Sequence, residues 1–134
     1  MEASAQKLRI RLWIAYILQG LLALMFLMGA FMNLMESETA VSQAVEMGYP
    51  AGSIRNLGIV LLLSTLLYLI PRTNLLGAIL LTAWLGGAVA THVIHGDPLV
   101  NILFPVFFGL LIWGLLMLRD PQFARWLPWR KKAV

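Results

Sequence analysis

Side chains able to act as acids, bases, metal ligands or anion binders are sparse in this sequence, and most of them border the same ends of its apolar segments. This set is Asn33, Glu36, Arg55, Asn56, His92, His95, Asp97 and Asn101. His92 and His95 are three residues apart, so a helix would present both on one face. Because Asn101 follows them after a short turn, we expect it to return beside them.

Two kinds of binding chemistry would use the histidines. Two histidines with Asp97 or Glu36 could ligate a divalent metal ion, but nothing supplies a defined third and fourth ligand, so we predict no metal site. His92 could instead donate a hydrogen bond to a carbonyl oxygen of a quinone headgroup, with Trp84 or Tyr49 stacked on the ring.

A third kind of chemistry would use Arg55 and Asn56, which lie at the positive N-terminal end of an expected helix. Such a helix end, together with a guanidinium group, favours a small anion. The alternative to all three is structural: the histidines lie at a membrane interface, and Arg55 pairs with Glu36.

Catalytic signatures are missing from the sequence. We find no nucleophile paired with a base, no phosphate-binding loop and no pair of catalytic carboxylates. The chain has no cysteine, which excludes thiol–disulfide chemistry, iron–sulfur ligation and covalent haem attachment. The sequence therefore favours a protein that is not an enzyme.

Four long apolar segments must position these side chains, and they run over residues 12–34, 54–70, 75–94 and 99–118. A helix needs about 20 apolar residues to cross about 30 Å of hydrocarbon. The segments are continuously apolar rather than alternating, and four strands could not close a barrel in lipid. We predict an all-α protein, an integral membrane antiparallel four-helix bundle that forms one domain over residues 1–134.

The distribution of positive charge predicts the orientation of this bundle. Lys7, Arg9 and Arg11 precede the first segment, Arg72 lies between the second and third, and five basic residues follow the last. Only Arg55 falls on the other side. The positive-inside rule therefore places both termini in the cytoplasm and the first loop outside. We expect a multi-pass protein of the bacterial cytoplasmic membrane.

Two further segments are expected at the membrane surfaces. In the first loop, residues 36–52, apolar residues recur at helical spacing between Ser37, a capping residue, and Gly48, a residue suited to end a helix. This short external helix would either simply close the bundle or cover a ligand pocket. After Asp120, an interfacial cytoplasmic segment would carry Phe123, Trp126, Leu127, Trp129 and the basic tail.

Small residues mark the third segment as a packing element. Ala83, Gly87 and Thr91 recur every fourth position, a spacing that lets helix backbones approach closely. We expect this helix to be the most buried, either within the bundle or at a dimer interface. Gln19 should face the bundle interior or a neighbouring chain, and Asp97 should cap the fourth helix.

From these elements we predict a ligand pocket at the outer end, beneath the external helix. The residues that we expect there are His92, Asn101, Arg55, Asn56, Glu36 and Asn33. Convergent polar groups in a largely apolar bundle are the usual form of such a site.

An ordered set of short motifs resembles the DoxX-like family of small bacterial four-helix membrane proteins. They are Met47-Gly48-Tyr49-Pro50, Ile70-Pro71-Arg72-Thr73 with Leu76-Gly77, Gly86-Gly87-Ala88-Val89-Ala90-Thr91-His92 with Gly96-Asp97-Pro98, Phe104-Pro105, and Leu118-Arg119-Asp120-Pro121. The resemblance implies a four-helix bundle in the bacterial cytoplasmic membrane, a link to quinol oxidation and thiosulfate–quinone chemistry, and, for some relatives, a place in oxidant-defence complexes. The chain departs from common family patterns at Asn33, where many relatives are basic, and at Leu61, where a glutamate is frequent nearby.

The leading functional hypothesis is a membrane subunit or a lipid- or small-ligand-binding module. The alternatives are a quinone-linked redox accessory protein and a small-solute transporter that works as an oligomer. The expected partners are membrane lipid and a second copy of the chain or a larger membrane complex. Nucleic acid is not expected, because basic residues beside membrane spans are an ordinary topology signal.

Overall fold

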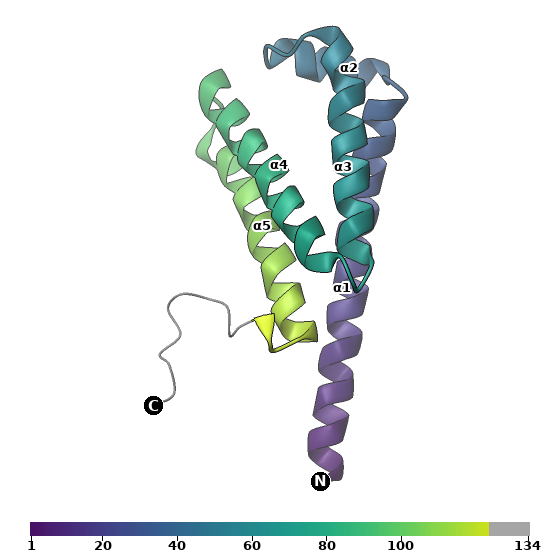
Figure 1. Cartoon of the computed structure of the whole chain (residues 1–134). Coiled ribbons are helices and arrows are strands. Elements are labelled where there is room, and N and C mark those ends of the chain that lie inside the picture. Colours follow the sequence, from purple (N-terminus) through teal and green to yellow (C-terminus); the bar gives the residue numbers. More distant parts are fainter. Residues whose placement is uncertain (124–134) are drawn as a thin grey trace.

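The computed structural model describes residues 1–123, and that part of the chain is built from helices without strands (Figure 1). The elements are α1 (Glu2–Leu34), α2 (Glu38–Glu46), the short 3₁₀ helix η1 (Ala51–Ser53), α3 (Ile54–Leu69), α4 (Asn74–His95) and α5 (Leu99–Arg119). The helices α1, η1 with α3, α4 and α5 are long and apolar enough to span a membrane. The predicted helical membrane bundle is confirmed, while its orientation stays a prediction. Most of the expected C-terminal interfacial segment, including Trp126, Leu127 and Trp129, lies outside the described residues.

Local sequence signals set most of the helix ends. The Ser37 hydroxyl accepts a hydrogen bond from the Ala40 amide at 3.3 Å and so caps α2. Gly48 and Gly96 follow α2 and α4 with φ angles of 87° and 79°, a left-handed conformation that glycine adopts without a steric penalty. Ile70 is extended because Pro71 follows it, and α3 ends at the residue before.

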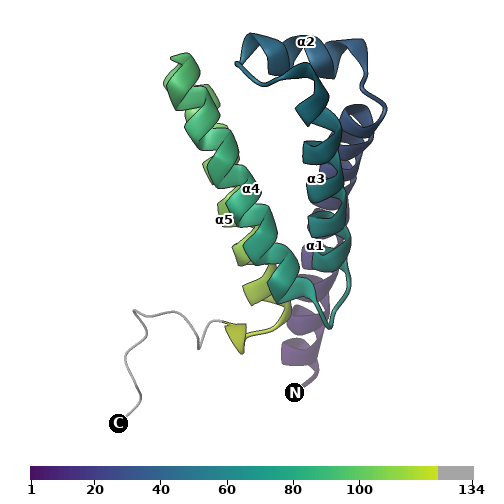
Figure 2. The same ribbon diagram turned by 45° about the horizontal axis from the view of Figure 1, so that its top comes forward.

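The four long helices form a ring in which each packs on two others. Close backbone contacts join α1 to α3, α3 to α4, α4 to α5 and α5 back to α1. Within the described chain the diagonal pairs α1/α4 and α3/α5 have no such contacts, although the Tyr68 hydroxyl of α3 donates to the Ile112 carbonyl oxygen of α5. Toward the α2 end, the α4–α5 pair diverges from the α1–α3 pair, and α2 lies across the opening (Figures 1 and 2). The bundle is therefore closed at the end where α4 begins and α5 ends, here called the terminal end, and wider at the other.

The buried core follows this shape. Its members are Ala15, Leu22, Phe26 and Ala30 of α1, Leu61 and Tyr68 of α3, Ala78, Leu81 and Leu85 of α4, and Ile112, Leu115 and Leu116 of α5. Our expectation that the third segment is the most buried was wrong. In the most apolar stretch of each helix, 22% of the residues of α4 are buried, against 33% for α1 and for the α3 span. Only the N-terminal half of α4 packs tightly, because the outer half diverges from α1 and α3.

Close backbone approach occurs at two glycines that periodicity did not single out. A Cβ atom on Gly77 of α4 would lie 2.6 Å from the Leu67 carbonyl carbon and closer still to the backbone of Tyr68. A Cβ atom on Gly58 of α3 would lie 2.9 Å from the Leu34 amide nitrogen of α1. At both places glycine lets two helix ends pack together.

A buried polar contact joins three helices near the termini. Gln19 of α1 is 3% exposed, and its amide nitrogen donates to the Tyr68 carbonyl oxygen of α3 at 3.3 Å. Its amide oxygen accepts a hydrogen bond from the guanidinium group of Arg119 on α5. The expectation that Gln19 faces the bundle interior is confirmed, and its partners are a helix-end carbonyl and a cation.

Candidate functional site

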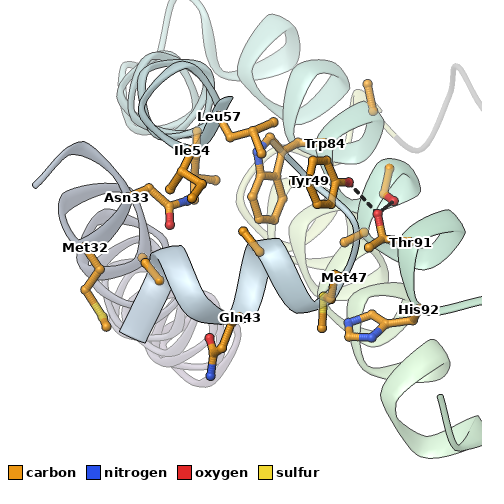
Figure 3. A pocket seen from close by; sticks show the side chains of 17 residues that line it. Met32, Asn33, Gln43, Met47, Tyr49, Ile54, Leu57, Trp84, Thr91 and His92 are labelled. Carbon is orange, nitrogen blue, oxygen red and sulfur yellow. Dashed lines mark hydrogen bonds between the residues drawn. The ribbon is translucent and has the colours of Figure 1, made fainter. Parts of the chain in front are cut away.

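A pocket of about 460 Å³ lies at the wider end of the bundle, between α1, α3 and α4 and beneath α2 (Figure 3). Its walls are mainly apolar, with Met32 of α1, Met47 after α2, Ile54 and Leu57 of α3 and Trp84 of α4 around the space. Among the described residues, none of α5 lines it. The volume falls in the range of about 300–1,000 Å³ typical of small-molecule sites.

The small residues of α4 make this space. Ala83, Gly87 and Thr91, the fourth-position series predicted to pack against another helix, all line the pocket. A Cβ atom on Gly87 would meet no heavy atom within 4 Å, and Gly87 itself is exposed. The prediction that this face packs closely on another helix of the bundle was therefore wrong, since no helix within the described chain lies against it. The alternative, a dimer interface, stays a prediction.

One hydrogen bond ties the cover of the pocket to α4. The Tyr49 hydroxyl, in the turn after α2, lies 2.5 Å from the Thr91 hydroxyl oxygen (Figure 3). Thr91 uses its own proton for the Gly87 carbonyl oxygen at 2.9 Å, so Tyr49 is the donor in the first bond. Between α2 itself and α4 no backbone packing occurs in the described residues. The Tyr49–Thr91 bond therefore links the end of α2, which covers the pocket, to the wall that α4 forms; we call this bond the latch.

His92 lies at the mouth of the pocket beside Met47 and is joined to a charged group outside it (Figure 3). Its Nδ1 donates to Asp97 Oδ2 at 2.5 Å, and Nδ1 of His95 donates to Asp97 Oδ1 at 2.8 Å. The hydrogen bond from His92, followed by that from His95, holds the pKa of Asp97 below its ordinary value of 3.8. The two ring nitrogens of an imidazole point in nearly opposite directions, so Nε2 of His92 is directed away from Asp97.

This arrangement corrects the expected role of Asp97. The N-cap of α5 is Pro98, whose side chain makes no capping hydrogen bond, and the Asp97 carboxylate is held by the two histidines instead. In residues 1–123 no group of three His, Asp or Glu side chains is arranged to hold a metal ion.

The structure brings together only part of the predicted site. His92 and Asn33 line the pocket. Four other predicted residues, Glu36, Arg55, Asn56 and Asn101, are exposed and do not line it. The structure therefore does not bring Asn101 and Arg55 into the pocket with His92.

The physical reason is helix rotation. Ile54 and Leu57 are three residues apart and face the pocket, so Arg55 and Asn56 between them point elsewhere. Asn101 belongs to α5, which lies behind α4 as seen from the pocket. No ion pair joins Arg55 to Glu36 within the described chain, so the structural alternative for these two residues is wrong as well.

Sequence reasoning missed most of the apolar lining and one unsatisfied donor. The indole Nε1 of Trp84 is buried and has no hydrogen-bond partner in the described part of the chain. Gln43 of α2 adds an amide to the lining. The helical spacing of Ala40, Ala44 and Met47 could have indicated which face of α2 turns inward, because these three residues line the pocket.

Comparison with known proteins gives one match. The model of the DoxX-like family matches residues 17–115, which contain α2, α3 and α4 and most of the pocket lining. No curated protein and no solved structure matches the chain.

Proposed function

The chain belongs to the DoxX-like family, and from that premise we propose that this multi-pass membrane protein is a binding module for an amphipathic small molecule of the lipid type. The observation that supports the proposal is the apolar pocket of about 460 Å³ beneath α2. A concave, mainly apolar site of this size with a few polar groups is the usual form of a small-molecule site, so it points to an occupant.

The chemistry of the pocket defines the class of this occupant. Its depth is lined by Leu61, Trp84 and other apolar side chains, while Asn33, Gln43 and His92 add polar atoms. An apolar body with a small hydrogen-bonding group would match both parts. The hydroxyl groups of the lining, Tyr49 and Thr91, are hydrogen-bonded to each other. His92 is hydrogen-bonded to Asp97, so the described residues pair no nucleophile with a base. The proposed role is therefore to bind or present the molecule rather than to transform it.

A quinone headgroup is the second candidate, on a specific observation. Trp84 and Tyr49 lie in the same pocket with His92 at its mouth (Figure 3). Their rings could stack on the ring of a quinone or quinol, and Nε2 of His92, whose proton is on Nδ1, could accept a hydrogen bond from a quinol hydroxyl. A quinone would differ from a lipid in its near-ultraviolet absorption and its redox activity.

The test compares two neighbouring glycines of α4. Gly86 and Gly87 are both exposed and both have open space at Cβ, but only Gly87 lines the pocket. Gly87→Leu should therefore fill part of the site, whereas Gly86→Leu makes the same chemical change outside it. Both should keep the fold, since leucine is a better helix former than glycine.

We expect native mass spectrometry of protein purified from membranes to detect a bound lipid or quinone on the wild type and on Gly86→Leu, with a large loss on Gly87→Leu. An absorption spectrum of the extracted molecule decides between lipid and quinone. Equal retention by all three proteins would contradict the proposal.

We also propose that the protein lies in the bacterial inner membrane with both termini in the cytoplasm, on the strength of the basic residues that precede the first span, lie between the second and third, and follow the fourth in the sequence. Because the chain has no cysteine, single cysteines can be introduced at Glu46 and Arg72. A membrane-impermeant thiol reagent added to intact cells should label Glu46→Cys and spare Arg72→Cys. The opposite pattern would reverse the orientation.

A further inference from the structure

A half-buried arginine without a carboxylate partner in the described chain lies at the end of the bundle opposite the pocket. Arg119, the last residue of α5, is half-buried against α1. Its Nη1 donates to the side-chain oxygen of Gln19, and its guanidinium carbon lies 4.5 Å from the centroid of the Tyr16 ring. Its Nε is buried and has no hydrogen-bond partner within residues 1–123.

Arg119 contacts the neutral side chains of Gln19 and Tyr16, and Gln19 is held toward it by a contact with α3. The Gln19 amide nitrogen is occupied by the Tyr68 carbonyl oxygen in the last turn of α3, which has no intrahelical donor because α3 ends at Leu69. This bond turns the amide oxygen of Gln19 toward Arg119. The acid nearest in sequence, Asp120, accepts instead from the Gln122 amide at 2.9 Å. No carboxylate lies within ion-pairing distance of Arg119 in the described chain.

The depth of Arg119 in the membrane indicates what could supply the missing negative charge. The 21 residues of α5 span about 31 Å at 1.5 Å per residue, close to the thickness of the hydrocarbon layer. Arg119 therefore lies where hydrocarbon meets headgroups. Tyr16, which lies beside it, is 53% exposed, and Trp13, one turn earlier in α1, is 69% exposed, as is typical of aromatic residues at that interface.

We propose that Arg119 binds the phosphate of an anionic phospholipid in the leaflet at the terminal end of the bundle. A half-buried cation is stable when it is paired, and a guanidinium group can give a phosphate two hydrogen bonds. In Arg119 these would come from Nη2 and from the Nη1 hydrogen that Gln19 does not use, because Nε is buried. Gln19 and Tyr16 orient the fork, and the lipid supplies the anion. The site is separate from the pocket beneath α2 and does not depend on the function proposed for that pocket.

The experiment places the purified full chain in nanodiscs with equal amounts of phosphatidylglycerol and phosphatidylcholine, and measures the lipids that remain bound by native mass spectrometry. Arg119→Gln removes the charge at the site. Arg72→Gln is the matched control, because Arg72 is an exposed arginine in the α3–α4 turn at the same end. We expect wild type and Arg72→Gln to prefer phosphatidylglycerol, and Arg119→Gln to lose that preference by about tenfold, as removal of one charge-assisted hydrogen bond implies.

A second variant keeps the proposal testable if Arg119→Gln does not fold. Arg119→Lys retains the charge and loses the planar fork, so it should keep part of the preference for phosphatidylglycerol. An unchanged preference in Arg119→Gln, or an equal loss in Arg72→Gln, would overturn a specific site. Displacement of the bound phosphatidylglycerol by millimolar inorganic phosphate would show a site for free phosphate rather than for a lipid.

Discussion

Replacement of Gly77 by alanine should destabilise the bundle although it adds only one methyl group. In Gly77→Ala the new Cβ atom would lie 2.6 Å from the Leu67 carbonyl carbon and closer to the Tyr68 nitrogen and Cα. These are backbone atoms at the end of α3, so no side-chain rotation can relieve the overlap. The start of α4 would have to move away from α3. Tyr68, which is fully buried and donates to the Ile112 carbonyl oxygen at 3.1 Å, would lose packing as a result.

The magnitude follows from three opposing contributions. Overpacking of a tight contact costs about 1–3 kcal/mol. Weakening of the Tyr68 hydrogen bond adds about 1 kcal/mol. Alanine in place of glycine within a helix returns about 1 kcal/mol. The net loss in the free energy of unfolding is therefore about 1–3 kcal/mol. At Gly86, where an added Cβ meets nothing within 4 Å, only the favourable helical contribution remains.

The assay is reversible unfolding in mixed dodecyl maltoside and dodecyl sulfate micelles, followed by far-ultraviolet circular dichroism. Gly77→Ala should unfold at a lower mole fraction of dodecyl sulfate than the wild type, and Gly86→Ala at an equal or higher one. The difference between the two variants should reach about 2–4 kcal/mol. If Gly77→Ala proves as stable as Gly86→Ala, the close approach of α3 and α4 at this turn is refuted.

Three other outcomes are expected. Gln19→Leu removes the acceptor of Arg119 and the donor to the Tyr68 carbonyl oxygen, so it should lower the free energy of unfolding by about 1–3 kcal/mol. The control Gln43→Leu, at an exposed residue of the pocket, should change that free energy little. Tyr49→Phe removes the latch to Thr91 and should speed amide hydrogen exchange in α2 without an equal change in α3, whereas protection unchanged in both would show that the bond does not hold the cover. Because the folded pKa of Asp97 lies below 3.8, its contribution to stability is complete above about pH 3.8 and is lost as the pH falls through the folded value, so the melting temperature of the wild type should drop more steeply in acid than that of Asp97→Asn.

The element boundaries could be predicted because each depends on residues adjacent in sequence. The Ser37 hydroxyl needs only the amide three residues later, and Gly48 and Gly96 need only their own φ angles. Pro71 acts on the residue before it. Long apolar segments predicted the spans in the same direct way, since the length of a span is fixed by the thickness of the bilayer.

The site could be predicted only in its location, because its lining depends on how each helix is rotated and tilted. Lipid removes the usual guide, since apolar residues face outward as well as inward; Phe104 and Phe107 are exposed while Ile112 is buried. A series of small residues is equally ambiguous. At Gly77 the absence of a side chain admits another backbone, and at Gly87 it leaves a hollow. The position of the opposing helix decides between the two, and this depends on contacts far apart in sequence.

The ring of helices, whose diagonal pairs have no close backbone contacts in the described chain, has a mechanical consequence. The α1–α3 and α4–α5 pairs are held together at the terminal end by Gly77 against Tyr68 and by Gln19 with Arg119, and they separate toward α2. In such an arrangement, a small change in the angle between the two helix pairs at their contact becomes a larger change in their separation near α2. Lateral pressure from the surrounding lipid acts on that angle, so bilayer thickness and tension would adjust the volume of the pocket while the contacts at the terminal end stay fixed.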